Sequence, residues 1–267
     1  MSYVKPEDVV ENMLQAGASK AGLSVTDMLI RGALSGAFLG YATTLAITAI
    51  TQTGTGIVGA LIFPVGFVMI ILLGLELATG NFALMPIAVM DHRTTMAKLA
   101  SNWTWVLTGN LIGSVLYACL YYIVMTNMGH IDPSTIAVTQ KIMAIAEHKT
   151  LAYASLGFAG IVTAFTSAVL CNWMVTLGVV MALTSTTTIG KIGAMWLPIM
   201  TFFALGYEHA IVNMFVIPAG IMLGASVTVA DWWLWNEIPV ILGNIVGGML
   251  FTGMALYLTA RKKVALT

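Results

Sequence analysis

The sequence has very little charge for its length. Of its 267 residues only 8% are Asp, Glu, Lys or Arg, and the 11 basic residues balance the 11 acidic ones. A chain without net positive charge has no electrostatic footprint for nucleic acid. Apolar residues make up 59%, and the mean hydropathy is +0.93. This composition excludes an ordinary water-soluble domain and is typical of a polytopic helical membrane protein.

Several chemical signatures are also missing. The two cysteines, Cys119 and Cys171, lie in apolar segments without metal-ligand spacing, so we interpret them as small buried hydrophobes rather than a disulfide or redox pair. No H-E-x-x-H or G-x-S-G motif offers the metal site or nucleophile of an intramembrane hydrolase. We therefore expect no enzymatic activity, no cofactor and no metal. A water or glycerol channel with two similar halves would carry N-P-A in both, and the chain has none.

What the chain does have is a repeated polar motif inside apolar sequence. Residues 74–86, GLELATGNFALMP, and 206–218, GYEHAIVNMFVIP, both fit G-x-E-x-A-x-x-N-x-x-x-x-P. Ionisable side chains at membrane depth are costly and indicate a functional site. The two copies differ at one chemically important position. Leu77 of the first copy stands where the second copy has the titratable His209.

Six apolar segments are each long enough to cross a bilayer. They cover approximately residues 28–50, 57–90, 100–126, 152–181, 188–224 and 232–259. The second and fifth exceed one crossing and contain the twin motifs. Such paired, interrupted segments in the two halves of a chain indicate a transport site built on broken helices.

The repeat extends to the third and sixth segments. Four residues of the third segment recur in the sixth at an offset of 134: Asn102, Gly109, Asn110 and Gly113 match Asn236, Gly243, Asn244 and Gly247. Two similar halves of three spans each must be inverted in the membrane. We therefore predict an all-α polytopic membrane protein with six transmembrane helices in a 3+3 inverted repeat, and with helices 2 and 5 broken.

The predicted organisation is one transmembrane domain over residues 1–267. It comprises a cytoplasmic N-terminal amphipathic helix (1–27), a first repeat (28–126), an extracytoplasmic linker (127–151), a second repeat (152–259) and a cytoplasmic tail (260–267). Nine Lys and Arg residues fall on the side of the termini and only Lys141 and Lys149 on the other, which predicts cytoplasmic termini. The N-terminal helix either packs under the bundle or acts as a movable plug. The chain start shows no removable signal peptide.

The break residues allow more than one role. A helix broken within a bilayer leaves unpaired backbone groups, which Glu76 and Glu208 can satisfy; direct proton transfer by these acids is the alternative. His209 has no counterpart in the first copy, so the fold does not require a ring there. A proton donor or selectivity residue is favoured over an inert buried histidine. Thr79 lies one turn from its break and offers a hydroxyl to orient the imidazole.

Apolar side chains surround these positions. Phe63 and Phe67 share a helical face, and Phe202 precedes His209 by seven residues, which puts it on the same side of a helix. These rings are either core packing or hydrophobic constrictions that block a hydrated ion. Lys149 is either a solvated residue or a group that draws anions to the outer entrance.

Four motifs in order resemble the formate/nitrite transporter family over nearly the whole chain. They are E-L-x-T-G-N at 76–81, C-N-W-M-V at 171–175, G-Y-E-H-x-x-x-N-M at 206–214 and G-N-I-x-G-G at 243–248. The resemblance implies an aquaporin-like fold, a homopentamer with one pore per protomer, and a bacterial or archaeal cytoplasmic membrane. It also implies passage of small monovalent anions such as formate, nitrite or hydrosulfide.

The resemblance further assigns roles by motif. His209 is similar to the family's central pore histidine, Thr79 to its hydrogen-bonding partner and Lys149 to its vestibule lysine. Asn172 and Asn244 match polar pore residues, and Leu77 and Phe202 match constriction residues.

One position departs from the pattern. Ala78 stands where formate channels carry a phenylalanine, so the constriction is expected to be wider unless Phe67 compensates. The F-P-V-G-F at 63–67 is most similar to the formate branch.

We therefore predict that formate is concentrated at the outer mouth, is protonated at the His209–Thr79 site, and crosses as neutral formic acid. A bare anion would have to lose its hydration shell at the apolar constrictions, which is costly. A second hypothesis keeps His209 neutral or cationic throughout and lets the anion itself pass. Nitrite or hydrosulfide is the alternative substrate.

Overall fold

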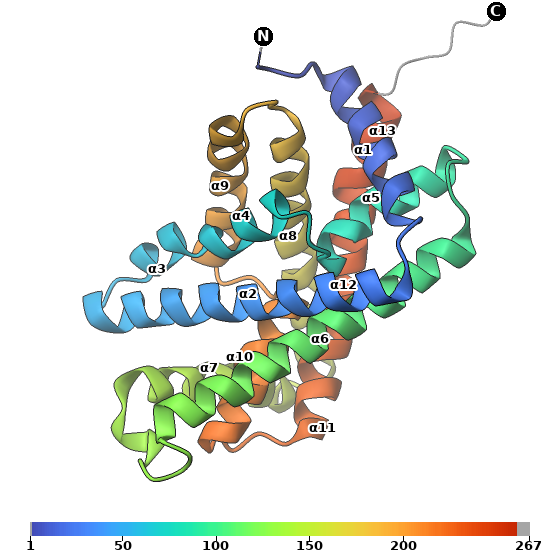
Figure 1. Ribbon diagram of the computed structural model, residues 1–267. Coiled ribbons are helices and arrows are strands. Elements are labelled where there is room, and N and C mark those ends of the chain that lie inside the picture. Colours follow the sequence, from blue (N-terminus) through green and yellow to red (C-terminus); the bar gives the residue numbers. More distant parts are fainter. Residues whose placement is uncertain (1, 261–267) are drawn as a thin grey trace, which may run out of the picture.

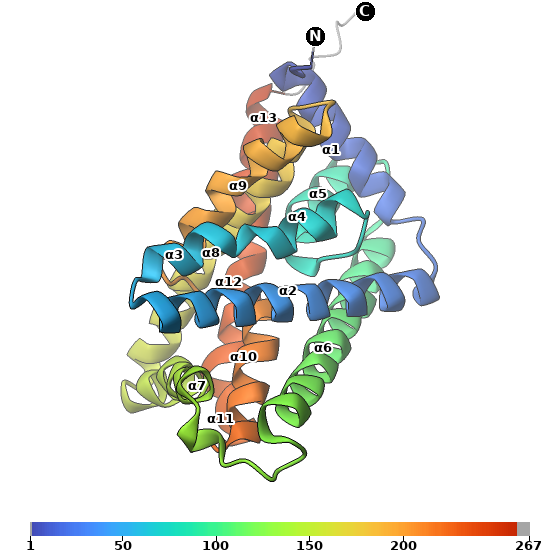
Figure 2. The same cartoon turned by 60° about the vertical axis from the view of Figure 1, so that its left-hand side comes forward.

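The computed structural model describes residues 2–260, and helices make up most of that range. Figures 1 and 2 both place the first helix and the end of the last helix at one end of the molecule, with the connections around residues 130 and 226 at the other. The predicted cytoplasmic tail, with Arg261, Lys262 and Lys263, lies outside the described residues apart from Ala260. The N-terminal helix and the end of the last helix therefore lie at the same end of the molecule.

Within residues 2–260, four helices are long and apolar enough to cross a membrane. They are α2 (Val25–Thr53), α6 (Met96–Thr126), α8 (Phe158–Leu183) and a final helix over Val229–Ala260. The final helix consists of α11 (Val229–Trp232), the π-helical η2 (Trp233–Glu237), α12 (Ile238–Val246), the π-helical η3 (Gly247–Met254) and α13 (Ala255–Ala260).

Shorter apolar helices follow α2 and α8 in equivalent ways. After α2 come α3 (Gly56–Ile62), α4 (Pro64–Leu72) and α5 (Ala78–Met90); after α8 come α9 (Thr188–Ala204) and α10 (Ala210–Leu223). The helical backbone stops before Gly74 and Gly206, whose φ angles of 63° and 70° lie in the left-handed region that glycine adopts without strain. The twin sequence motifs thus mark the two helix interruptions.

Each half begins with a helix that lies at one end of the molecule. α1 (Pro6–Lys20) buries the face predicted from its sequence, including Val9 and Met13. Its Gly17 approaches α5 so closely that a Cβ there would lie 2.4 Å from the carbonyl oxygen of Leu84. The amphipathic pattern therefore corresponds to packing against α5.

α7 occupies much of the region predicted as a linker. After the 3₁₀ turn η1 (Pro133–Thr135), α7 runs over Ala137–Ser155, and the chain turns at Gly157, whose φ is 58°. α8 therefore begins at Phe158 rather than near residue 152. Residues 151–156 are apolar, but composition cannot show that a left-handed glycine ends one helix and starts another.

α1 is also fastened to the connection between α5 and α6. The Arg93 guanidinium donates two hydrogen bonds to Glu11, at 2.7 and 2.8 Å, and one to Asp91 at 2.8 Å. The Glu11 carboxylate, followed by that of Asp91, raises the Arg93 pKa above its ordinary value. The Arg93 guanidinium of this contact therefore stays charged throughout the physiological pH range.

The two halves pack in the same way. Gly113 of α6 meets α2 so closely that a Cβ would lie 1.8 Å from the carbonyl oxygen of Ala33. Its repeat counterpart Gly247 meets α8 at Val169, where the same distance is 2.3 Å. Small residues permit this close approach between helices. α1, α2, α5 and α6 thus correspond to α7, α8, α10 and the final helix, with α1 and α7 at opposite ends (Figure 1).

Candidate pore site

The two helix interruptions meet at a pair of buried side chains. The Thr79 hydroxyl lies 3.1 Å from Nε2 of His209, and both residues are almost completely buried. Nδ1 of the same ring accepts a hydrogen bond of 3.2 Å from the Val212 N–H, so the imidazole caps the start of α10. The ring is therefore held from both of its nitrogen atoms.

This geometry selects one tautomer of His209. Because Nδ1 accepts the Val212 N–H, a neutral ring carries its hydrogen on Nε2 and donates it to the Thr79 hydroxyl. Thr79 then has its own hydroxyl hydrogen left to donate. An imidazolium would have to give up the bond that caps α10.

Phe202 covers the imidazole, although not for the reason the sequence spacing suggests. The two rings stack with centroids 5.5 Å apart and an angle of 23°. Seven residues would be two turns of one helix, but α9 ends at Ala204 and the chain folds back at Gly206. Phe63 supports Phe202 from behind in an edge-on contact at 5.6 Å.

The carboxylate of the first interruption lies in a small polar network. Glu76 forms an ion pair with Lys20 of α1 at 2.7 Å and accepts a hydrogen bond of 2.8 Å from Asn81. Asn81 also donates to Asn102 of α6, and Asn102 donates to the Lys20 carbonyl. The cation for Glu76 thus comes from the N-terminal helix.

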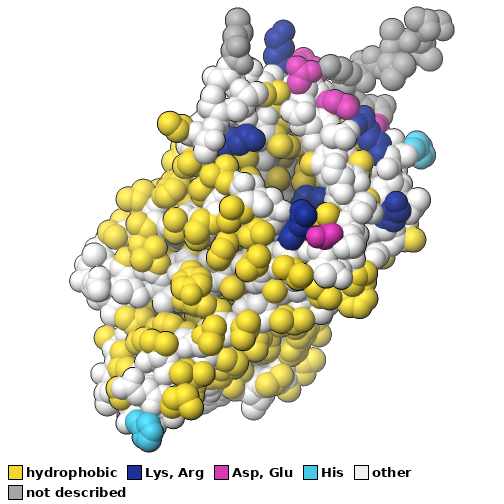
Figure 3. Space-filling model, viewed as in Figure 1, with side chains coloured by type: hydrophobic (Ala, Val, Ile, Leu, Met, Phe, Trp, Pro, Cys, Tyr) yellow, Lys and Arg dark blue, Asp and Glu magenta, His cyan; other side chains and the backbone are white. Residues whose placement is uncertain are grey.

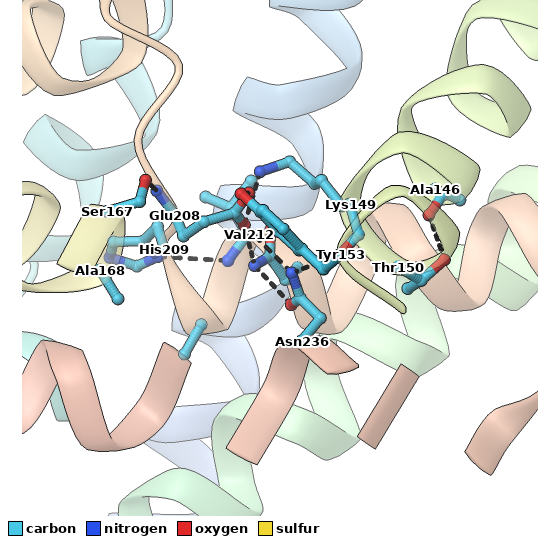
Figure 4. A network of polar contacts seen from close by, with 12 residues as sticks. Ala146, Lys149, Thr150, Tyr153, Ser167, Ala168, Glu208, His209, Val212 and Asn236 are labelled. Carbon is cyan, nitrogen blue, oxygen red and sulfur yellow. Dashed lines mark hydrogen bonds and ion pairs between the residues drawn. The ribbon is translucent and has the colours of Figure 1, made fainter. Parts of the chain in front are cut away.

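The second interruption repeats this arrangement and adds to it (Figure 4). Glu208 pairs with Lys149 of α7 at 2.8 Å and accepts from Asn213 at 2.8 Å and from Asn236 at 3.2 Å. Asn236 also donates to the Lys149 carbonyl. The Tyr153 hydroxyl donates a further hydrogen bond of 3.0 Å to Glu208, whereas the side-chain donors to Glu76 in the described part of the chain are Lys20 and Asn81.

Asparagines, rather than the glutamate carboxylates, satisfy the backbone at the two breaks. Asn110 accepts from the Ala78 N–H at 3.0 Å and donates to the Glu76 carbonyl. Asn244 accepts from the Ala210 N–H at 3.0 Å and donates to the Glu208 carbonyl. The expectation that Glu76 and Glu208 accept these amides is wrong, because both carboxylates are occupied by lysine and side-chain amide donors.

Asn172 connects the two halves beside the histidine. Its amide nitrogen donates to the carbonyl oxygens of Thr79, at 3.0 Å, and Asn244, at 2.6 Å. Its side-chain oxygen is buried and has no hydrogen-bond partner in the described part of the chain. This oxygen is an available acceptor close to the Thr79–His209 pair.

Two larger cavities lie on either side of this centre. The α7-side cavity, of about 530 Å³, is lined by Lys149, Tyr153, Phe202, Glu208 and His209 among others. The α1-side cavity, of about 370 Å³, is lined by Lys20, Arg31, Glu76 and Lys191 among others.

A third cavity, of about 40 Å³, contacts Lys20, Leu77, Asn81 and Val179 and has room for very few waters. Phe63 and Phe67 are buried and line none of these three cavities.

Three residues of these polar networks could not be recognised from the sequence motifs: Lys20, Asn110 and Tyr153. In the sequence, Lys20 is one of the nine basic residues that indicate topology, Asn110 is the repeat counterpart of Asn244, and Tyr153 belongs to no motif. Lys20 and Lys149 differ by 129 positions rather than 132 or 134, so they fall out of register with the motifs. Lys20 is the last residue of α1 whereas Lys149 lies inside α7, so the position within the helix gave no common signal either.

Glu237 is a further buried acid that the sequence did not suggest. It accepts the indole N–H of Trp232 at 2.8 Å, and it lies outside the two networks. Within residues 2–260, no group of three or more His, Cys, Asp or Glu side chains is placed to hold a metal ion.

Two buried helix starts, a hydroxyl–imidazole pair and a lysine-lined cavity on either side are an arrangement that suits a membrane transport protein. The family model for the formate/nitrite transporter matches residues 7–258. The probable formate transporter of Methanothermobacter thermautotrophicus is 35% identical over 98% of this chain and 99% of its own length.

Solved structures agree. An FNT family ion channel has a TM-score of 0.80 and 26% identity, covering 94% of this chain and 98% of its own. A pentameric formate channel with formate bound has a TM-score of 0.72 and 27% identity, covering 88% and 96%. The chain belongs to the formate/nitrite transporter family and is a multi-pass membrane protein.

Proposed function

We propose that this protein is a channel for small monovalent anions, with formate as its principal substrate. The carrying observation is the buried His209–Thr79 pair between two cavities that each hold a lysine. Similarity to a probable formate transporter and to a formate channel with formate bound supports the choice of substrate. The pathway runs from the α7-side cavity to the α1-side cavity past this pair.

The proposed topology has six crossings. The segments Gly56–Met90 and Thr188–Leu223 each make one crossing from two half-helices, and together with the four long helices they form the inverted repeat. We assign α1 and both termini to the cytoplasm and residues 127–151, including most of α7, to the outer side. The assembly is a homopentamer in a bacterial or archaeal cytoplasmic membrane, by analogy with the pentameric relative.

Anions are attracted by the lysine of each cavity. The ammonium of Lys149 has three hydrogens and forms an ion pair with Glu208, so further N–H groups are available to an anion in the α7-side cavity. Lys20 is placed in the same way in the α1-side cavity. Glu208 and Glu76 hold these lysines in position, which is their proposed role.

Between the cavities the anion meets an apolar passage bounded by Phe202 and Leu77. A desolvated carboxylate is costly there, whereas the neutral acid is not. Formate accepts a hydrogen bond from the Thr79 hydroxyl, takes a proton from a hydronium ion in the α7-side cavity, which leaves water, and crosses as formic acid. The proton returns to water on the α1 side. His209 stays in the neutral tautomer and orients Thr79, while Asn172 and Asn244 hold the two half-helices together.

The test is formate uptake into proteoliposomes with and without an inward proton gradient. In wild type we expect the gradient to accelerate uptake. His209→Phe should abolish the coupled component and leave assembly intact. Because the ring also caps α10, His209→Asn is the better matched variant: asparagine is a good N-cap, but it is too short to replace the Nε2 contact with the Thr79 hydroxyl.

Undiminished proton-coupled formate uptake in both variants would end this mechanism. Parallel uptake of nitrite and hydrosulfide identifies the substrate. Faster wild-type uptake of either ion than of formate would replace formate as the principal substrate and leave the channel assignment in place.

A further inference from the structure

The α1-side cavity contains more positive charge than a monovalent substrate needs. Three basic side chains from three separate helices line it: Lys20 from α1, Arg31 from α2 and Lys191 from α9. On the face shown in Figure 3, the visible Lys and Arg side chains lie toward the end that carries α1, and the rest of that face is largely hydrophobic. The charge is thus concentrated around one opening.

Little of this charge is neutralised within the cavity. Glu76 is the one carboxylate among the residues that line it, and Lys20 already pairs with it at 2.7 Å. Arg31 has an exposed contact with Asp27 at 3.7 Å and a long hydrogen bond of 3.4 Å to the Gly74 carbonyl. Lys191 forms no ion pair with any residue that the structure describes. Lys191 is therefore free of an ion pair, and Arg31, whose pair with Asp27 is long and exposed, still has guanidinium N–H groups for a ligand.

These groups suit an oxyanion with more than one negative charge. A guanidinium offers a planar fork of N–H donors that matches phosphate, and an ammonium adds a point charge. The cavity of about 370 Å³ has room for such an ion, but the adjoining space of about 40 Å³ does not admit a hydrated one. A multivalent oxyanion that enters would stay at the mouth.

We propose that the α1-side cavity binds a multivalent oxyanion of the phosphate class through Arg31 and Lys191, with Lys20 beneath them, and that its occupation stops anion passage. Binding is independent of the transport function proposed above, and only the block depends on it. The phosphate group belongs either to a free ion or to the headgroup of an anionic lipid. Both sources present the same chemistry to the basic side chains.

Binding is tested on the purified full-length protein in detergent, by thermal unfolding with increasing inorganic phosphate and with chloride at matched ionic strength. We expect phosphate to raise the Tm of wild type and chloride not to. Arg31→Gln/Lys191→Gln should weaken the apparent phosphate affinity by about a hundredfold, since two charge-assisted hydrogen bonds are lost. Arg31→Lys/Lys191→Arg, which keeps both charges, should retain most of the affinity.

Two variants control for the loss of charge elsewhere. Lys98→Gln removes an exposed cation on α6 outside the cavity, and Lys141→Gln removes one that lines the α7-side cavity. Both should keep the phosphate response of wild type. An equal response of Arg31→Gln/Lys191→Gln and these controls, or an equal effect of chloride and phosphate, overturns the proposal.

Flux measurements identify the source of the phosphate group. In phosphatidylcholine vesicles with phosphate on both sides, formate uptake by wild type should fall, and uptake by Arg31→Gln/Lys191→Gln should not. If vesicles containing phosphatidylglycerol slow wild type alone without added phosphate, the lipid headgroup is the ligand. Equal flux of wild type and variant in both arms overturns the block. Phosphate stabilisation without any formate flux in wild type would instead contradict the transport function and leave binding standing.

Discussion

Glu76 and Glu208 occupy equivalent positions but have unequal support. Glu208 accepts hydrogen bonds from Lys149, Tyr153, Asn213 and Asn236, whereas Glu76 accepts from Lys20 and Asn81. Both carboxylates are almost completely buried. Removing the cation that pairs with a buried carboxylate strongly lowers the free energy of unfolding. Hydrogen-bond donors that still contact the carboxylate reduce this loss.

We therefore predict that Lys20→Met destabilises the protein more than Lys149→Met. The expected loss for Lys20→Met is about 3 kcal/mol, at the lower end for a broken buried pair because the lysine is partly exposed. Lys149→Met should cost roughly half as much, because Tyr153 and Asn236 still donate to Glu208. The measurement is thermal unfolding of purified protein in detergent.

The double variant Lys20→Met/Glu76→Gln is the control for this comparison. It removes both charges and should recover most of the stability lost in Lys20→Met. A larger loss for Lys149→Met than for Lys20→Met would show that the extra donors to Glu208 do not compensate.

At the scale of the helices, contact between α2 and α6 depends on glycine. The position where a Cβ on Gly113 would lie, 1.8 Å from the Ala33 carbonyl oxygen, is occupied by backbone rather than by a movable side chain. Gly193 lies in the interior of α9, and a Cβ there would have no neighbouring helix of the described chain within 4 Å. These two glycines therefore serve as test and control.

Gly113→Ala should separate α2 from α6 and cost about 3 kcal/mol or more, as overpacking against rigid structure does. Gly193→Ala should instead stabilise the protein by roughly 0.5–1 kcal/mol, because alanine is the better helix former. Thermal unfolding and the yield of monodisperse protein measure both. Equal behaviour of the two variants would mean that α2 and α6 are not in this close contact in the membrane.

At the scale of the whole molecule, the basic residues define two unlike ends. Within residues 2–260 the cations at the α1 end are Lys5, Lys20, Arg31, Arg93, Lys98 and Lys191, and those of the α7 end are Lys141 and Lys149. An excess of Lys and Arg marks the cytoplasmic side of a membrane protein. The same asymmetry makes the two cavities electrostatically different.

Thiol labelling of intact cells tests this orientation. In a background without Cys119 and Cys171, we introduce His130→Cys in the exposed connection before α7 or Lys98→Cys at the start of α6. A membrane-impermeant maleimide should label His130→Cys in intact cells and Lys98→Cys only after permeabilisation. The reverse pattern would place α1 outside and contradict the proposed topology.

The sequence by itself determined the class of protein and the place of its centre. The composition predicted an all-helical membrane protein, and the twin motifs predicted the position of both helix interruptions. The resemblance to the family predicted that Thr79 is the hydrogen-bonding partner of His209. The comparisons confirm the family, and the structure confirms the contact between these two side chains. The helical class and the interruptions could be predicted because hydropathy and glycine positions act locally along the chain, whereas the contact across 130 positions was implied by the family resemblance.

The tertiary structure alone decided which groups serve that centre. Lys20 reaches Glu76 across 56 positions, Asn110 and Asn244 cap half-helices from other segments, and Phe202 meets His209 only because the chain folds back at Gly206. Many polar side chains in this sequence are chemically able to make each of these contacts. Which of them does so depends on how separate helices pack, and the order of residues along one helix carries no direct record of that packing.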